Sequence, residues 1–187
     1  MQELFDGLTL YHGSYCEVKQ PDLQQGAKYK DFGQGFYLTS SREQAESFIR
    51  TSVKKAALSG RVDEKQNFGF ISVFRFSTNE ALNIWTYPDA DIEWLHCVVG
   101  HRRKNTFSEI VNEMKKYDII AGKIANDNTN ATIAAYMALA YGQIGTKPAD
   151  DMCISLLLPE RLKDQFCFRT DAALKSVKFV GSEKIWL

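Results

Sequence analysis

The sequence predicts an α+β fold, in which strands and helices follow one another without regular βαβ units. Short apolar and aromatic stretches of strand character are separated by longer segments with helical periodicity. No G-x-G-x-x-G motif follows the first expected strand, which argues against a doubly wound dinucleotide-binding sheet.

Length and composition indicate one globular domain spanning residues 1–187. The chain is 44% hydrophobic and 25% charged, as folded domains are. Its 23 basic and 23 acidic residues give a formal net charge of zero. This balance excludes a wholly basic surface for nucleic acid but allows a local basic patch.

The cysteines and the N-terminus indicate in which cellular compartment the protein is found. Cys16, Cys97, Cys153 and Cys167 form no C-x-x-C pair, so neither metal-ligand spacing nor a disulfide framework is indicated. Reduced cysteines are typical of a cytoplasmic protein. The N-terminus lacks the features of a signal peptide, and no run approaches the roughly 20 apolar residues of a membrane span. We therefore expect a soluble cytoplasmic protein without a metal site or a membrane partner.

The expected elements follow from periodicity and turn signals. The first half should contain strands at residues 8–12, 36–39 and 69–76, with a helix capped by Ser40 or Ser41 after the second strand. The second half should contain helices at 89–99, 107–116 and 131–141, strands at 117–124 and 165–170, a short helix capped by Asp171, and a strand or bent hairpin at 178–187.

Two short motifs in the first part of the chain have the character of a binding site. In YHGS, residues 11–14, His12 ends a strand, and Gly13 would let a ligand approach the backbone closely. In FGQGFYLT, residues 32–39, Tyr37 offers a flat ring and a hydroxyl after two glycines. Taken separately, each motif has an ordinary alternative, a structural histidine or a core aromatic residue.

Taken together, the two motifs and the following helix SSREQAESF resemble the poly-ADP-ribose-polymerase-like branch of the ADP-ribosyltransferase superfamily. They are similar in particular to an uncharacterised bacterial family of that branch, the DUF3990 type. The resemblance is strong near the N-terminus and weaker at the C-terminus. It implies the ADP-ribosyltransferase fold, with two small antiparallel sheets around an NAD cleft and peripheral helices. NAD would serve as co-substrate.

The resemblance also implies roles for individual residues. The implied NAD-binding set is His12, Gly13, Ser14, Gly35, Tyr37 and Phe48. In it His12 binds ribose hydroxyls, the backbone of Gly13 receives the nicotinamide carboxamide, and Ser14 adds a further bond. Tyr37 stacks on the nicotinamide ring, Phe48 covers its other side, and the glycines shape the slot.

The third catalytic position departs from the family pattern. A Glu begins a late strand in the family, and Gln165 stands there in this chain. An amide can hydrogen-bond a ribose hydroxyl, but it carries no charge and cannot act as a base. Asp164 is a poor substitute, because neighbours on a strand face opposite ways. Poly-ADP-ribose chain growth is therefore not expected, and Gln165→Glu would restore the family carboxylate.

The resemblance thus implies a mono-ADP-ribosyltransferase that modifies a protein or nucleic acid. Bacterial relatives of this type act as toxins or defence proteins, which implies a neutralising antitoxin partner. Two alternatives stay open. An NAD glycohydrolase would use water in place of the acceptor, and a non-catalytic module would bind NAD or ADP-ribose without turnover.

Two polar stretches have both a structural and a functional interpretation. Asn126 and Asp127 in NDNTN fit a helix cap, or they border the cleft on the acceptor side. The basic run HRRK, residues 101–104, with Lys115 and Lys116 beyond it, fits a solvated face or a contact with acceptor phosphates. His96 and His101 lack companion ligands, which argues against a metal.

Overall fold

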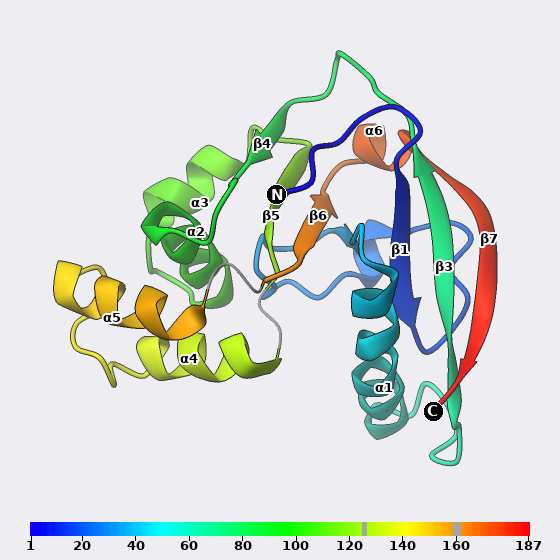
Figure 1. Cartoon of the computed structure of the whole chain (residues 1–187), viewed down its shortest axis with the longest axis horizontal. Coiled ribbons are helices and arrows are strands. Elements are labelled where there is room, and N and C mark those ends of the chain that lie inside the picture. Colours follow the sequence, from blue (N-terminus) through cyan, green and yellow to red (C-terminus); the bar gives the residue numbers. More distant parts are fainter. Residues whose placement is uncertain (125–126, 159–161) are drawn as a thin grey trace.

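The structure, a computed structural model, describes residues 1–124, 127–158 and 162–187. Two small sheets lie side by side, one of them at an edge of the molecule, and the described residues also form six α-helices (Figure 1). The α+β class expected from the sequence is confirmed. None of the helices in these ranges is both long and apolar enough to cross a membrane.

The first sheet is antiparallel and has the strand order β1-β3-β7. Its strands are β1 (Thr9–Ser14), β3 (Phe68–Phe76) and β7 (Val177–Trp186). The last strand is continuous, with a register irregularity opposite Val73 and Phe74, and is not a bent hairpin.

The strand β1 is longer than expected at its C-terminal end. Gly13 and Ser14 pair with Ile71 and Phe70 of β3, so the ladder continues past His12. The expectation that His12 ends its strand is therefore wrong. His12 therefore lies within the ladder between β1 and β3, where it is paired with Ser72, and not at the end of a strand.

The second sheet has the order β2-β6-β5-β4. Its strands are β2 (Phe36–Leu38), β6 (Asp164–Phe168), β5 (Ile119–Lys123) and β4 (Ile84–Thr86). Because β4 runs parallel to β5, this sheet is mixed rather than wholly antiparallel as expected. The sequence analysis missed β4, whose three residues are too few to show a two-residue alternation.

The two sheets are joined where β1 passes the end of β2. Tyr11 and Thr39 exchange backbone hydrogen bonds of 2.8 and 3.0 Å in an isolated bridge. Apolar side chains from both sheets pack together beside this bridge. They include Leu10, Leu38, Phe74, Phe166 and Phe168, all 2% exposed or less.

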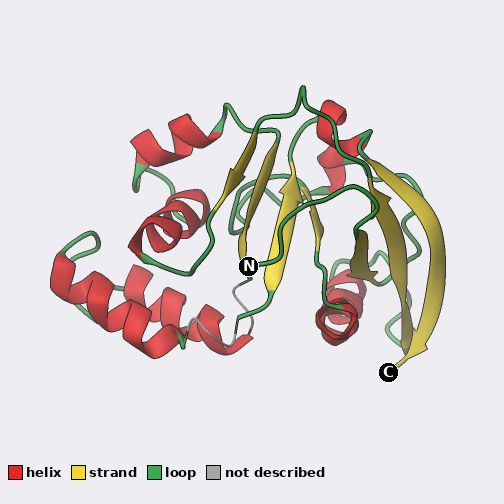
Figure 2. Ribbon diagram, turned by 45° about the horizontal axis from the view of Figure 1, so that its top comes forward, coloured by secondary structure: helices red, strands yellow, loops and turns green. Residues whose placement is uncertain are grey.

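Helices pack against both sheets (Figure 2). The helix α1 (Arg42–Leu58) is capped by Ser41, one of the two residues expected to cap it. It packs on the first sheet through Ala45 and Ile49. The helices α2 (Ile92–Arg102), α3 (Ser108–Met114), α4 (Asp127–Met137) and α5 (Lys147–Leu157) lie on the far side of the second sheet. Trp94 and Ile120 are among the buried residues between them and that sheet.

Three helical expectations need correction. The helix α5 was not expected, although Ala149, Cys153 and Leu157 are buried at the four-residue spacing of a helical face. The helix α4 occupies residues 127–137 rather than 131–141. The short helix α6 (Asp171–Leu174) is capped by Thr170, whose hydroxyl accepts the Ala173 N–H, and not by Asp171.

Candidate functional site

A cavity of about 680 Å³ is lined by residues from both sheets and from α1. His12 of β1, Tyr37 of β2 and Gln165 of β6 all line it. Three residues that lie on separate strands are therefore brought to one pocket. Its volume falls within the range of small-molecule sites, roughly 300–1,000 Å³.

The other residues of the implied NAD-binding set divide into two groups. Gly13 and Phe48 line the same cavity, whereas Ser14 and Gly35 do not. Ser14 is buried, and Gly35 lies against β6. A Cβ on Gly35 would come within 2.8 Å of the Phe168 carbonyl oxygen.

The glycines of both motifs are explained by packing within the protein. A Cβ on Gly13 would overlap the carbonyl oxygen of Ala45, so this glycine lets β1 and α1 approach closely. Gly33 has a φ of +79°, which favours glycine, and lies against the ring of His101. A close approach by a ligand is not needed to account for these glycines.

The imidazole of His12 is held in one tautomer. Its Nδ1 donates to the Tyr37 carbonyl oxygen over 2.8 Å, which leaves Nε2 as the acceptor nitrogen. Burial lowers the pKa of His12 to about 4, with the Lys30 ammonium lowering it further and the bond to Tyr37 opposing the shift. At neutral pH the ring is uncharged, and Nε2 can accept a hydrogen bond from a hydroxyl.

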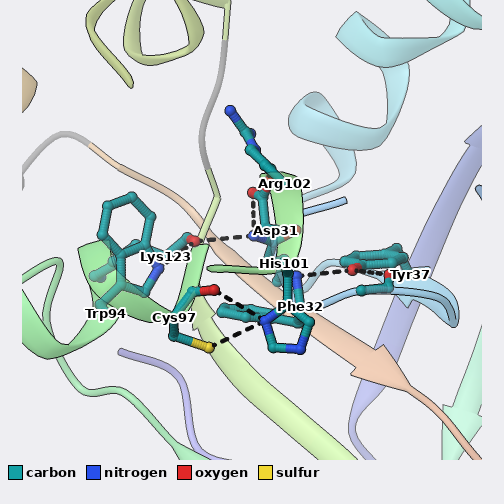
Figure 3. A network of polar contacts seen from close by, with 10 residues as sticks. Asp31, Phe32, Tyr37, Trp94, Cys97, His101, Arg102 and Lys123 are labelled. Atoms are coloured by element: carbon teal, nitrogen blue, oxygen red, sulfur yellow. Dashed lines mark hydrogen bonds and ion pairs between the residues drawn. The ribbon is translucent and has the colours of Figure 1, made fainter. Parts of the chain in front are cut away.

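Tyr37 forms a fixed wall of the cavity. Its hydroxyl donates to the Gly33 carbonyl oxygen over 2.7 Å and accepts the Phe32 N–H over 3.0 Å (Figure 3). Burial raises the pKa of this hydroxyl well above its ordinary value, so it stays protonated. Because the hydroxyl is bound to the preceding loop, the ring face is what remains for a ligand.

A cation already lies beside the aromatic wall. The Lys30 Nζ is 5.0 Å from the centroid of the Tyr37 ring and 5.9 Å from that of Phe48. Both distances lie within the range of cation–π attraction, about 6 Å. Burial lowers the pKa of Lys30. The two rings therefore define a place in the cavity that attracts positive charge.

Gln165 is oriented by both hydrogens of its amide. Its Nε2 donates to Asp31 Oδ2 over 2.7 Å and to the Lys123 carbonyl oxygen over 3.0 Å. With both N–H groups engaged, Oε1 is left as an acceptor. Gln165 thus offers an oxygen acceptor in the cavity, as a carboxylate would, without its own charge.

A carboxylate lies one hydrogen bond away from Gln165. Asp31 is 7% exposed and also lines the cavity. Arg102 donates to Asp31 Oδ1 through Nε over 2.9 Å and also through Nη2, as Figure 3 shows. A carboxylate is therefore held beside the Gln165 amide, at position 31, by an arginine and by that amide.

Asp164 faces away from this arrangement, as the alternation along a strand predicts. Its Oδ1 pairs with the Lys123 Nζ at 3.0 Å, and its Oδ2 accepts the backbone N–H of Gln2. Asp164 therefore does not line the cavity, and both of its carboxylate oxygens are bound elsewhere.

The basic run at residues 101–104 does not form one patch. His101 is buried and its Nδ1 lies 2.9 Å from the Cys97 carbonyl oxygen, whereas Arg102 reaches Asp31. Arg103 donates to the Met137 carbonyl oxygen, and Lys104 lies over Tyr29. The interpretation as a solvated face therefore fails for His101 and Arg102, whereas Arg103 and Lys104, which follow α2, are exposed.

The remaining polar residues of the sequence analysis have simpler outcomes. The ring of His96 stacks on Phe107 and lies 2.8 Å from the buried Asp150 carboxylate. No group of three or more potential metal ligands occurs in residues 1–124, 127–158 and 162–187. Asn126 lies outside the described residues, and for Asp127 only its place at the start of α4 is described.

Sequence reasoning missed Lys30, Asp31 and Arg102 as parts of this site. Lys30 and Asp31 directly precede the FGQGFYLT motif, and that position was the available signal. Arg102 is distant in sequence and was treated only as part of a basic run. Its pairing with Asp31 spans 71 residues, a separation for which a single sequence offers no local sign.

The fold and the site define an α+β protein with a cavity lined by both small sheets and by α1. The family model described as "Protein of unknown function (DUF3990)" matches residues 8–179. The chain belongs to this DUF3990 family, and the matched span contains every residue of the site described above. A comparison with curated proteins finds no match.

Proposed function

We propose that the chain transfers the ADP-ribosyl group of NAD, once per acceptor position, to a macromolecule. The proposal is supported above all by the meeting of His12, Tyr37 and Gln165 in one cavity from three strands. These are the positions that the resemblance to ADP-ribosyltransferases implies. The ADP-ribosyltransferase fold and the use of NAD are parts of the same proposal.

The chemistry of the wall residues suits NAD. The neutral Nε2 of His12 accepts a hydrogen bond from a ribose hydroxyl. The rings of Tyr37 and Phe48 attract positive charge, and the nicotinamide ring of NAD is cationic. In this proposal nicotinamide takes the place at which the Lys30 ammonium lies in the free protein.

The reaction breaks the bond between the nicotinamide nitrogen and ribose C1′. The bonding pair stays on nitrogen, neutral nicotinamide leaves, and positive charge develops on the ribose. A lone pair of the acceptor then forms the new bond to C1′, and the acceptor proton is lost to water. The site must hold the dinucleotide and stabilise the ribose cation, and it need not protonate the leaving group.

The pair of Gln165 and Asp31 would supply this stabilisation. Gln165 Oε1 contacts the ribose as a neutral acceptor, and its N–H donates to the Asp31 carboxylate. That charge makes the amide oxygen more negative, since charge-assisted hydrogen bonds polarise their donors. Asp31 is a positioning residue in this scheme, and the missing Glu is replaced by two side chains.

The test uses NAD labelled on its adenylate phosphate, incubated with the protein and a cell lysate. Label should enter a macromolecule, and later treatment with protease or nuclease should identify the acceptor class. His12→Ala should abolish labelling. Thr9→Ala is the matched control, because Thr9 lies on the same strand and does not line the cavity.

The other outcomes identify the competing functions. Consumption of NAD without a labelled macromolecule would indicate a glycohydrolase. Intact NAD, together with an NAD-dependent rise in the melting temperature, would indicate a binding module. Either outcome rejects the transferase.

A further inference from the structure

A second cavity, of about 410 Å³, borders the same loop as the first. Lys30 and Asp31 line the first cavity, Gly33 and Gln34 line the second, and Tyr29 lines both. The far wall of the second cavity comes from the end of α2 and from α3. Any molecule bound there would lie beside the proposed NAD site.

The second cavity is lined by positive charge alone. Its cationic residues are Lys28, Lys104, Lys115 and Arg169. Of the residues that the structure describes, no Asp or Glu lines it, and none of these four cations takes part in an ion pair. Such a cavity favours an anionic ligand.

The polar contacts of these cations leave their charge uncompensated. The Lys115 Nζ donates to Asn112 Oδ1 over 2.9 Å, and Arg169 donates to the Met114 carbonyl oxygen. The Lys104 Nζ lies 5.6 Å from the centroid of the Tyr29 ring. Neutral oxygens and an aromatic face orient cations without neutralising them.

The aromatic residue between the two cavities is largely exposed. Tyr29 exposes 55% of its surface, so its ring is accessible to a ligand. Cationic side chains beside an exposed aromatic ring are the arrangement by which proteins bind single-stranded nucleic acids. The cations contact phosphates, and a base stacks on the ring.

We propose that the second cavity binds the phosphate backbone of a single-stranded nucleic acid, with a base stacked on Tyr29 at the mouth of the first cavity. The inference rests on the proposed function in one respect, since only transfer from NAD makes the bound strand an acceptor. An acidic peptide would satisfy the cations but has no planar base for Tyr29. The observations therefore favour nucleic acid over protein.

The experiment measures binding in the absence of NAD. Fluorescence anisotropy follows labelled single-stranded RNA and DNA of roughly 12 nucleotides over a series of salt concentrations. The test variant carries Lys28→Ala, Lys104→Ala and Lys115→Ala. Its matched control carries Lys54→Ala, Lys65→Ala and Lys178→Ala, exposed lysines outside the cavity that give the same change in net charge.

The test variant should bind at least about tenfold more weakly than the control at moderate salt, with the salt-dependence slope reduced by about 2. Tyr29→Ala should weaken binding by roughly tenfold without changing that slope. Equal binding by the two triple variants overturns the inference. So does a polyglutamate peptide of matched charge that binds more tightly than the oligonucleotides.

Failure of the proposed function is recognised separately. If oligonucleotide binding depends on the three lysines but labelled NAD is never consumed, the nucleic-acid site stands and the transferase is rejected. If NAD is consumed and a macromolecule is labelled, but the two triple variants bind oligonucleotides equally, the transferase stands and the nucleic-acid site is rejected.

Discussion

Exchanging the charges of Asp31 and Gln165 tests whether these two residues together replace the missing Glu. The single variants are Asp31→Asn and Gln165→Glu, and the double variant carries both. In the double variant the carboxylate stands at position 165, and the amide at position 31 can donate to it. The total charge of the site is then the same as in the unmodified protein.

The hydrogen-bonding distances set the expected magnitudes. Gln165 Nε2 lies 2.7 Å from Asp31 Oδ2, so Gln165→Glu places two carboxylates about 3 Å apart. At an effective dielectric constant of about 20, this repulsion is about 5 kcal/mol, part of which the Arg102 guanidinium offsets. Gln165→Glu also removes the donor to the Lys123 carbonyl oxygen. We therefore expect Gln165→Glu to lower activity, although it would restore the carboxylate that the resemblance to ADP-ribosyltransferases implies.

Asp31→Asn removes the charge and leaves Arg102 without its carboxylate partner. Loss of one electrostatic contact to a developing charge typically lowers kcat by about 10²–10³-fold. We expect a loss of this size, with KM for NAD changed far less, because the charge matters most when the ribose becomes cationic. The double variant should recover to within about tenfold of the unmodified protein.

The assay is nicotinamide release at saturating and limiting NAD, with the melting temperature recorded for each variant. Asp31→Asn with an unchanged kcat would contradict the role given to Asp31. A double variant no more active than either single variant would contradict the coupling. A purely structural salt bridge would lower the melting temperature, but it would not make activity return when the charge is moved.

Three further predictions concern single residues. The pKa of His12 is about 4 in the folded protein against an ordinary 6.5, so the free energy of unfolding should fall as the pH drops from 6.5 towards 4, by at most about 3 kcal/mol. Urea unfolding of the unmodified protein and of His12→Gln over this pH range measures the effect. A difference in stability between the two proteins that does not change with pH would contradict it. Gly13→Ala should destabilise the protein by about 4 kcal/mol or prevent folding, whereas Gly181→Ala, which meets no atom within 4 Å, should be nearly neutral in thermal unfolding. Lys30→Met should tighten NAD binding about three- to tenfold, as measured by calorimetry, because the Lys30 ammonium no longer competes for the faces of the Tyr37 and Phe48 rings. Weaker binding would instead show that Lys30 contacts the NAD phosphates.

The parts of the fold that could be predicted are those with a local signal. The helix α1 has a cap, an early acidic residue and a regular apolar stripe, and it occurs where expected. The strand β4 has three residues and is defined by its pairing with β5, which is a non-local property. The end of α4 shows the same limit, because helical propensity continues through Ala138 and Ala140 although the helix ends at Met137.

The candidate site divides in the same way. His12 and Tyr37 stand out because a short motif surrounds each of them. Asp31 has no such motif, and its importance comes from two contacts, with Gln165 at a separation of 134 residues and with Arg102 at 71. Position 165 considered alone has an amide where the resemblance to ADP-ribosyltransferases implies a carboxylate, whereas in the folded chain the Asp31 carboxylate lies one hydrogen bond away.

This arrangement shows how a site can keep its electrostatics when one residue changes. What acts on a substrate is the position of an oxygen acceptor and of a negative charge, and one side chain need not provide both. In this proposal Gln165 provides the oxygen and Asp31 provides the carboxylate, which pairs with the Arg102 guanidinium in a buried place. If the charge exchange restores activity as expected, the amide at position 165 is part of a working site. It would then be no sign of an inactive one.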